Sequence, residues 1–371
     1  MSFATTIIQW FREHGRDLPW RDTCDPYAIW LSEIILQQTR IEQGRPYWER
    51  FMRRWPTVND LAAASEDEVL REWQGLGYYS RARNLHAAAK QVVAMGGFPT
   101  TIEGLRALKG VGDYTAAAIG SFAFGLPAAV VDGNVYRVLS RHFGIATPIN
   151  TTEGKKEFAL LAQELLPSLT GRAGVGRPSS LTERAGVGLY NQGMMDFGAT
   201  LCTPQSPQCL TCPLQETCVA FREGRVQQLP VKEKKLQVKE RHLIYIYIRV
   251  NGYTALHRRP AGDIWQGLYE PLCIEMKDEK LNMKDAPFPL PHREGRGGSL
   301  LPLKMHVKHV LTHRILYADF WLWELSERPT LPADYFWVKE EELDNYAVPR
   351  LVEKLLEKLD PPPAPPCDGG E

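Results

Sequence analysis

Cysteine, net charge and long apolar runs are what this sequence has least of. Only seven cysteines occur in 371 residues, which excludes the disulfide framework of a small secreted domain. No apolar run is long enough to cross a membrane, and the N-terminus shows no cleavable signal segment. We therefore expect a cytoplasmic chain with no membrane partner, in which the scattered Cys24, Cys273 and Cys367 are reduced.

An excess of charge of one sign is equally absent. The 44 Lys and Arg residues balance 44 Asp and Glu residues, and neither half of the chain is basic. A nucleic-acid partner would therefore be bound through local geometry, because no charged tail is available to attract it. The length and a hydrophobic content of 44% predict two domains.

The hydrophobic period changes once along the chain. Residues 1–225 carry apolar runs of helical period between glycine turns, whereas residues 241–360 alternate with a period of two and close with a helix. Residues 226–240 are charged and predict a linker, and residues 361–371 predict a disordered tail. The expected fold class is therefore multidomain, an all-α domain followed by an α+β domain.

The second domain shows strand patterns separated by turn residues. The expected elements are strands at 242–250, 253–257, 317–325 and 335–338, a hairpin turn at 251–252 and a helix at 350–359. In the first domain, the five residues 172–176 recur word for word as 184–188. This duplication at 171–188 is too short for a repeat unit, and we expect a surface loop there.

The four remaining cysteines gather in one short stretch with the spacing C-x6-C-x2-C-x5-C. Thiolates are the soft ligands that hold zinc or iron–sulfur clusters. Only one of the three gaps has the two-residue length usual in zinc ribbons, so the spacing favours a 4Fe–4S cluster over zinc. The expected ligands are Cys202, Cys209, Cys212 and Cys218.

Two carboxylates are candidates for chemistry. Glu33 interrupts an apolar helical run at 28–36, where burial would raise its pKa and let it donate a proton near neutral pH. The alternative is a side chain that reaches solvent at a domain surface. Asp132 stands between an apolar run and a helical pattern, a position that by itself indicates a helix N-cap.

A glycine turn containing Gly110 and Gly112 comes directly before a helix of small residues. Glycines let the backbone approach a phosphate, and the start of a helix offers free N–H groups, so this turn could anchor the DNA backbone without reading its sequence. The alternative is an ordinary junction between two helices.

Residues 9–225 resemble the helix-hairpin-helix DNA glycosylases, in particular the adenine DNA glycosylases of the MutY type. The resemblance rests on segments 18–21 (LPWR), 30–39 (WLSEIILQQT), 75–85 (GLGYYSRARNL), 108–116 (LKGVGDYTA), 131–135 (VDGNV) and 191–196 (NQGMMD), and on the four cysteines. It implies a bacterial cytoplasmic monomer that works at the nucleoid, and it identifies the cofactor as a 4Fe–4S cluster.

The resemblance also implies the reaction and its partner. Enzymes of this family bind double-stranded DNA that contains adenine opposite 8-oxoguanine or guanine, flip the adenine out and hydrolyse its N-glycosidic bond. Glu33 would be the general acid that protonates adenine N7, and Asp132 would stabilise the oxocarbenium sugar. Asn134 would orient the sugar and the carboxylate.

Other matched positions would contact the DNA. Arg21 and Gln192 match positions near the extruded adenine, although related enzymes carry Glu at the second of these positions. Gln38 and Tyr78 match residues that are inserted beside the 8-oxoguanine. The remaining members of the expected DNA-binding set are Gln37, Thr39, Gly110 and Gly112. Residues 203–208 carry no charge where relatives have basic residues, so this loop should add little salt-dependent affinity.

Tyr114 occupies the hairpin position where endonuclease III-type enzymes carry a lysine that forms a Schiff base. Tyrosine cannot form one, so we place Tyr114 with the catalytic residues of a monofunctional glycosylase. A bifunctional endonuclease III-type glycosylase/lyase is the alternative. A DNA-binding protein without enzymatic activity is a third possibility. The presence of both Glu33 and Asp132 argues against it.

Residues 241–360 resemble the Nudix-like C-terminal domain of the same enzymes through segments 258–260, 264–271 and 309–313. The helix rich in glutamate that binds magnesium in active Nudix enzymes is not found after Pro271, so we expect no pyrophosphatase activity. Leu311, Thr312 and His313 align with a Phe-Ser-His loop that reads 8-oxoguanine, a base that one or two hydrogen bonds distinguish from guanine.

Overall fold

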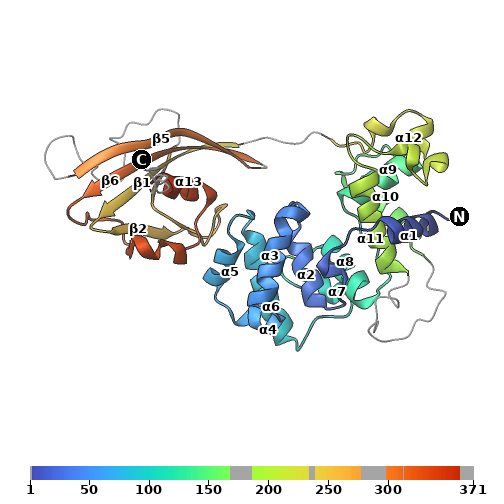
Figure 1. Cartoon of the computed structure of the whole chain (residues 1–371), viewed down its shortest axis with the longest axis horizontal. Helices are drawn as coiled ribbons and strands as arrows, with labels where there is room; N and C mark the ends of the chain where they lie inside the picture. Colours follow the sequence, from blue (N-terminus) through green and yellow to red (C-terminus); the bar gives the residue numbers. More distant parts are fainter. Residues whose placement is uncertain (1, 168–185, 234–238, 277–297, 312, 360–371) are drawn as a thin grey trace, which may run out of the picture. The chain divides into compact units, whose positions relative to one another are not determined.

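Two compact units make up the chain in the computed structural model (Figure 1). The structure describes residues 2–167, 186–233, 239–276, 298–311 and 313–359. The first unit comprises Met1–Ala64 and Asn84–Lys234, and the second comprises Ser65–Arg83 and Lys235–Glu371. No helix within the described ranges is both long enough and apolar enough to span a bilayer.

The first unit is helical, which confirms the all-α prediction for this part of the chain. Its helices are α1 (Phe3–His14), α2 (Pro26–Ile35), α3 (Ile41–Arg54), α4 (Val58–Ala63), α6 (Ser80–Ala94, whose first residues belong to the second unit), α7 (Ile102–Arg106), α8 (Asp113–Phe124), α9 (Gly133–Phe143), α10 (Thr152–Glu164), α11 (Val187–Asp196) and α12 (Val219–Arg222).

Helices α2 and α8 are buried over almost their whole length. All ten residues of α2 are buried, as its nearly unbroken apolar sequence requires. Because many residues of α8 are small, α2 and α11 can each pack closely against it. A Cβ at Gly188 of α11 would lie only 2.9 Å from the carbonyl oxygen of Ser121 in α8. The surface-loop prediction is therefore wrong for Val187 and Gly188, which begin α11 and are buried. Gly186 is described too, with φ 139° directly before α11, whereas the rest of the duplication lies outside the described residues.

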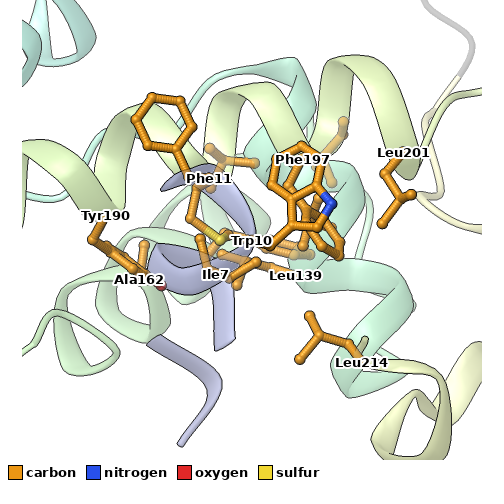
Figure 2. Packing of buried hydrophobic residues seen from close by; sticks show 14 residues of the cluster. Ile7, Trp10, Phe11, Leu139, Ala162, Tyr190, Phe197, Leu201 and Leu214 are labelled. Atoms are coloured by element: carbon orange, nitrogen blue, oxygen red, sulfur yellow. The ribbon is translucent and has the colours of Figure 1, made fainter. Parts of the chain in front are cut away.

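A hydrophobic cluster joins the N-terminal helix to elements near the end of the unit (Figure 2). Ile7, Trp10 and Phe11 of α1 pack with residues of α9, α10 and α11 and with Leu214 of the cysteine loop. The Trp10 ring meets the Phe197 ring edge-on, with centroids 4.9 Å apart. This packing fixes α9 and α11, which carry residues of the site described below.

The second unit contains a sheet of seven strands within the described ranges. They are β1 (Lys239–Val250), β2 (Tyr253–Arg258), β3 (Tyr269–Glu270), β4 (Leu272–Met276), β5 (Gly298–Val310), β6 (Arg314–Leu325) and β7 (Tyr335–Lys339). The order is β3-β2-β1-β6-β5, with β4 also paired to β1 and β7 to β2. Strands β1 and β6 run parallel, and the other pairs are antiparallel.

The α+β prediction for this part of the chain is confirmed. The four predicted strands lie within β1, β2, β6 and β7, and the predicted helix coincides with α13 (Arg350–Leu359). Asn251 and Gly252 form the predicted hairpin turn with φ of 48° and 77°. The unit also includes α5 (Glu66–Trp73), whose Asp67 accepts hydrogen bonds from Arg258 and Tyr269.

Candidate active site

A pocket of about 870 Å³ in the first unit collects most of the predicted site residues. Its walls come from α2 and the turn after it, from the starts of α8 and α9, and from α11. Of the residues singled out in the sequence, it is lined by Arg21, Glu33, Gln37, Gln38, Thr39, Gly112, Tyr114, Asp132, Asn134 and Gln192. Its volume lies in the range of sites that enclose a small molecule.

Glu33 is a carboxyl group of this pocket with a strongly perturbed pKa. Its side chain is buried within α2, which excludes the solvent-exposed alternative. Burial raises the pKa of Glu33 to about 7, although the hydrogen bond from Tyr114 and the charge of Arg21 oppose the shift; nearby Asp132 raises it further. The carboxyl therefore holds its proton over a pH range in which an exposed glutamate is ionised.

Tyr114 is the hydrogen-bond partner of Glu33. It lies in the first turn of α8, and its hydroxyl donates to Glu33 Oε2 over 2.7 Å. Burial, together with the carboxylates of Glu33 and Asp132, raises the pKa of the Tyr114 phenol well above its usual value of 10. The phenol thus remains a neutral donor that fixes one oxygen of the acid.

Asp132 is both the N-cap of α9 and part of the pocket wall. Its Oδ1 accepts from the backbone N–H groups of Asn134 and Val135, at 2.9 and 2.8 Å, and its Oδ2 accepts from Asn134 Nδ2 at 2.7 Å. Burial raises the pKa of Asp132, whereas these three hydrogen bonds and the charge of Arg137 act against the shift. Asp132 therefore caps the helix and also lines the pocket. The groups that donate hydrogen bonds to it stabilise its ionised carboxylate.

Asn134 is held in turn by Arg137, for which the sequence predicted no role. Arg137 Nη2 donates to Asn134 Oδ1 at 2.9 Å, and Arg137 Nε donates to the Cys202 carbonyl at 2.7 Å. One helical turn on, Arg141 donates to the carbonyls of Thr203 and Pro204. The four-residue spacing of the two arginines, which places both on one face of the helix, was the available indication.

Asp196 is a second residue of the site for which the sequence predicted no role. Burial by itself would raise the pKa of Asp196, but hydrogen bonds from Arg21 and Arg16 lower it to about 2. Arg21 binds it through both terminal nitrogens, at 2.8 and 2.7 Å. The fully buried carboxylate thus fixes the guanidinium of Arg21 at the pocket wall.

The four cysteines line a second, small pocket together with Arg141. Among the described residues, no three Cys, His, Asp or Glu side chains are arranged to hold a single metal ion. Burial raises the pKa of the Cys212 thiol to about 11, and the neighbouring cysteines add to the shift. Four soft donors around one pocket suit a polynuclear iron–sulfur cluster, whose charge would offset the cost of four neighbouring thiolates.

Several predicted residues lie elsewhere. Gly110 adopts φ 76° in the turn before α8, where Asn84 occupies the space that a Cβ would need. Tyr78 and the loop at 311–313 belong to the second unit. Leu311 is partly buried and donates its N–H to the Arg314 carbonyl, His313 is exposed, and Thr312 lies outside the described residues.

Two family models match the chain. The model of the HhH-GPD superfamily of base excision DNA repair proteins matches residues 31–167, and the NUDIX domain model matches residues 244–358. A solved structure of a thermostable thymine-DNA glycosylase is similar, with a TM-score of 0.51 and 30% identity, covering 60% of this chain and 95% of that one.

Two relatives are adenine DNA glycosylases. The mouse protein (Mus musculus) is 40% identical over 243 residues, which are 62% of this chain and 44% of that protein, so the chain spans less than half of it. The protein of Buchnera aphidicola subsp. Schizaphis graminum (strain Sg) is 31% identical over 282 residues, 75% of this chain and 76% of that protein. With the site geometry and this coverage of both chains, the protein belongs to the adenine DNA glycosylase family.

Proposed function

We propose that this chain removes adenine from double-stranded DNA in which the adenine is mispaired with 8-oxoguanine or guanine. The observation that carries the proposal is a single pocket in which the buried, protonatable Glu33 lies close to Asp132, the N-cap residue of α9. The substrate named by the relatives supports adenine as the base. Because the target atom is inaccessible inside a duplex, the base must be flipped into the pocket.

The two carboxyl groups divide the reaction between them. Glu33 gives its proton to adenine N7, so the bond between the sugar C1′ and N9 breaks with its electron pair remaining on a neutral purine. Asp132, ionised and held by Asn134, stabilises the positive charge that develops on the sugar. A water molecule then adds to C1′ and loses a proton to Glu33, which restores the acid.

The reaction proposed is hydrolysis alone. Tyr114 holds Glu33 through a neutral hydroxyl and offers no amine that could attack the sugar. The enzyme is therefore a monofunctional glycosylase, and strand cleavage is left to other proteins.

We further propose that Cys202, Cys209, Cys212 and Cys218 hold a 4Fe–4S cluster. When bound, the cluster would crosslink the loop that follows α11. Arg137 and Arg141 bind carbonyl groups of this loop, and Arg137 also binds Asn134, so an ordered loop supports the start of α9. No step of the hydrolysis passes through the cluster.

DNA binding is proposed to involve both units of a monomer. The turn at Gly110 and Gly112 would present backbone N–H groups to a phosphate. Gln38 and Tyr78 would fill the space left in the duplex, and the loop with Leu311, Thr312 and His313 would read the base opposite adenine.

A single-turnover assay tests this function. Duplexes with adenine opposite 8-oxoguanine, guanine or cytosine are incubated with excess enzyme, and free adenine is measured. We expect release opposite the first two bases and a loss of at least 100-fold in Glu33→Gln, since an amide keeps the shape without the proton. Glu49→Gln, an exposed glutamate of α3, is the control.

Two outcomes would contradict the proposal. The first is adenine release by Glu33→Gln at the wild-type rate. The second is a robust covalent adduct after borohydride reduction, which would indicate a Schiff base and a lyase.

A further inference from the structure

Tyr78 combines exposure with an unfavourable backbone conformation. Its side chain is 44% exposed, and its φ is +47°, in the left-handed region that residues other than glycine rarely adopt. Such a conformation persists only where the surroundings hold it in place. The residues around it therefore decide whether the ring is presented in one orientation.

Arg81 is the centre of those surroundings. Its guanidinium lies 5.1 Å from the Trp73 ring centroid and 5.6 Å from that of Tyr78. Its Nη2 donates to the carbonyls of Leu76 and Gly77, at 3.3 and 3.2 Å. The Trp73 indole N–H donates to the same Gly77 carbonyl at 3.0 Å. One cation thus contacts both rings and the backbone immediately before Tyr78.

Arg81 is poorly suited to bind a DNA phosphate. Its side chain is only 9% exposed, between two aromatic rings and with two carbonyl acceptors. Burial lowers the pKa of the guanidinium to about 10, so the group still carries its charge at neutral pH. The charge faces the backbone carbonyls of Leu76 and Gly77. Removing the charge should therefore leave the salt dependence of DNA binding unchanged.

We propose that Arg81 is the positioning residue for Tyr78, holding its ring as a preformed filler for the space beside the base opposite adenine. The inference rests on the function proposed above. Arg81 then acts on the preference for 8-oxoguanine over guanine and not on the chemistry of excision. A residue that only stabilised the fold would lower the rates of adenine excision opposite 8-oxoguanine and opposite guanine by the same factor.

The test compares Arg81→Lys with wild type and with Lys90→Gln, which removes an exposed charge from the same helix. Lysine keeps the charge but lacks the planar guanidinium, which contacts two rings while its Nη2 donates to two carbonyls. We expect the ratio of single-turnover rates opposite 8-oxoguanine and guanine to fall about 5- to 10-fold in Arg81→Lys. The rate opposite guanine should stay within twofold, and Lys90→Gln should change neither.

A double-mutant cycle with Tyr78→Ala separates positioning from general stability. If Arg81 acts through Tyr78, Arg81→Lys causes no further loss in the Tyr78→Ala background. Full additivity, or an equal fall of both rates, overturns the inference. Should Arg81→Lys not fold, Trp73→Phe, which removes the N–H donor to Gly77 and leaves a smaller ring against Arg81, should shift the ratio in the same direction; an unchanged ratio contradicts the inference.

A binding measurement keeps this test apart from that of the proposed function. Fluorescence of 2-aminopurine placed next to the 8-oxoguanine reports unstacking by an inserted ring and requires no excision. Wild type should raise the signal, and Arg81→Lys should raise it less. Absence of adenine release by wild type would defeat the proposed function, whereas equal fluorescence for both proteins would defeat only the role of Arg81.

Discussion

Glu33 shows how one residue can be recognised from its neighbours in sequence. Its segment is apolar on every face, so burial could be predicted, and burial is the main cause of its raised pKa. Its partner Tyr114 follows 81 residues later, and no local pattern joins the two. The role of Asp196 could not be predicted for the same reason, because its arginine partners lie 175 and 180 residues away in the sequence.

The raised pKa of Glu33 sets the pH dependence of excision. The acid form is the active one, and it predominates below a pKa of about 7 and is lost as the pH rises above it. The single-turnover rate should therefore be level in weakly acidic solution and fall about tenfold per pH unit well above pH 7. A rate that stays constant from pH 6 to pH 9 would remove Glu33 as the acid.

At the scale of elements, the start of α9 connects the pocket to the cysteine loop. Asp132 caps the helix on the pocket side, and Arg137 and Arg141 hold the loop backbone from the same helix. Gly198, just after α11, lies against this start. A Cβ at Gly198 would come within 2.9 Å of the Asn134 carbonyl oxygen, so any side chain there must displace α9.

Gly198→Ala should therefore impair the site without touching substrate. We expect a lower Tm and at least a tenfold lower excision rate, because Asn134 and Asp132 would move together. Gly133→Ala is the control for stability, since no atom lies within 4 Å of a Cβ built there. Wild-type Tm and rate in Gly198→Ala would show that α9 accommodates the methyl group.

The strands show where sequence patterns fail at this scale. β1, β2, β6 and β7 were predictable because they alternate or carry continuous apolar residues. β3 has only two residues, and β5 pairs with β6 through irregularities between Pro302 and Lys304 and between Lys304 and Val307. Such register shifts interrupt the period of two on which strand prediction depends. The grouping of the four cysteines around one small pocket, by contrast, could be predicted from their spacing alone.

At the scale of the whole molecule, balanced charge limits how strongly the chain attracts a polyanion. The chain has no net charge, and residues 203–208 of the cysteine loop are neutral. Gln205 of this loop is exposed, and its backbone oxygen accepts a hydrogen bond from the Gln227 side chain. A cation placed there is therefore free to meet a phosphate.

Gln205→Lys should steepen the salt dependence of DNA binding. One added phosphate contact changes the slope of log K against log salt by about −0.9, and the affinity at low salt should rise accordingly. Titrations at several salt concentrations measure both quantities, with Gln205→Met as the neutral control. An unchanged slope would mean that this loop does not approach the DNA backbone.

The packing of α1 has a consequence for synthesis on the ribosome. Ile7, Trp10 and Phe11 are translated well before Tyr190 and Phe197, with which they pack and which follow roughly 180 residues later. At about 5–20 residues per second, the nascent chain keeps these three side chains without their partners for on the order of ten seconds or more. Chaperones that bind emerging apolar segments would meet this helix before its core exists.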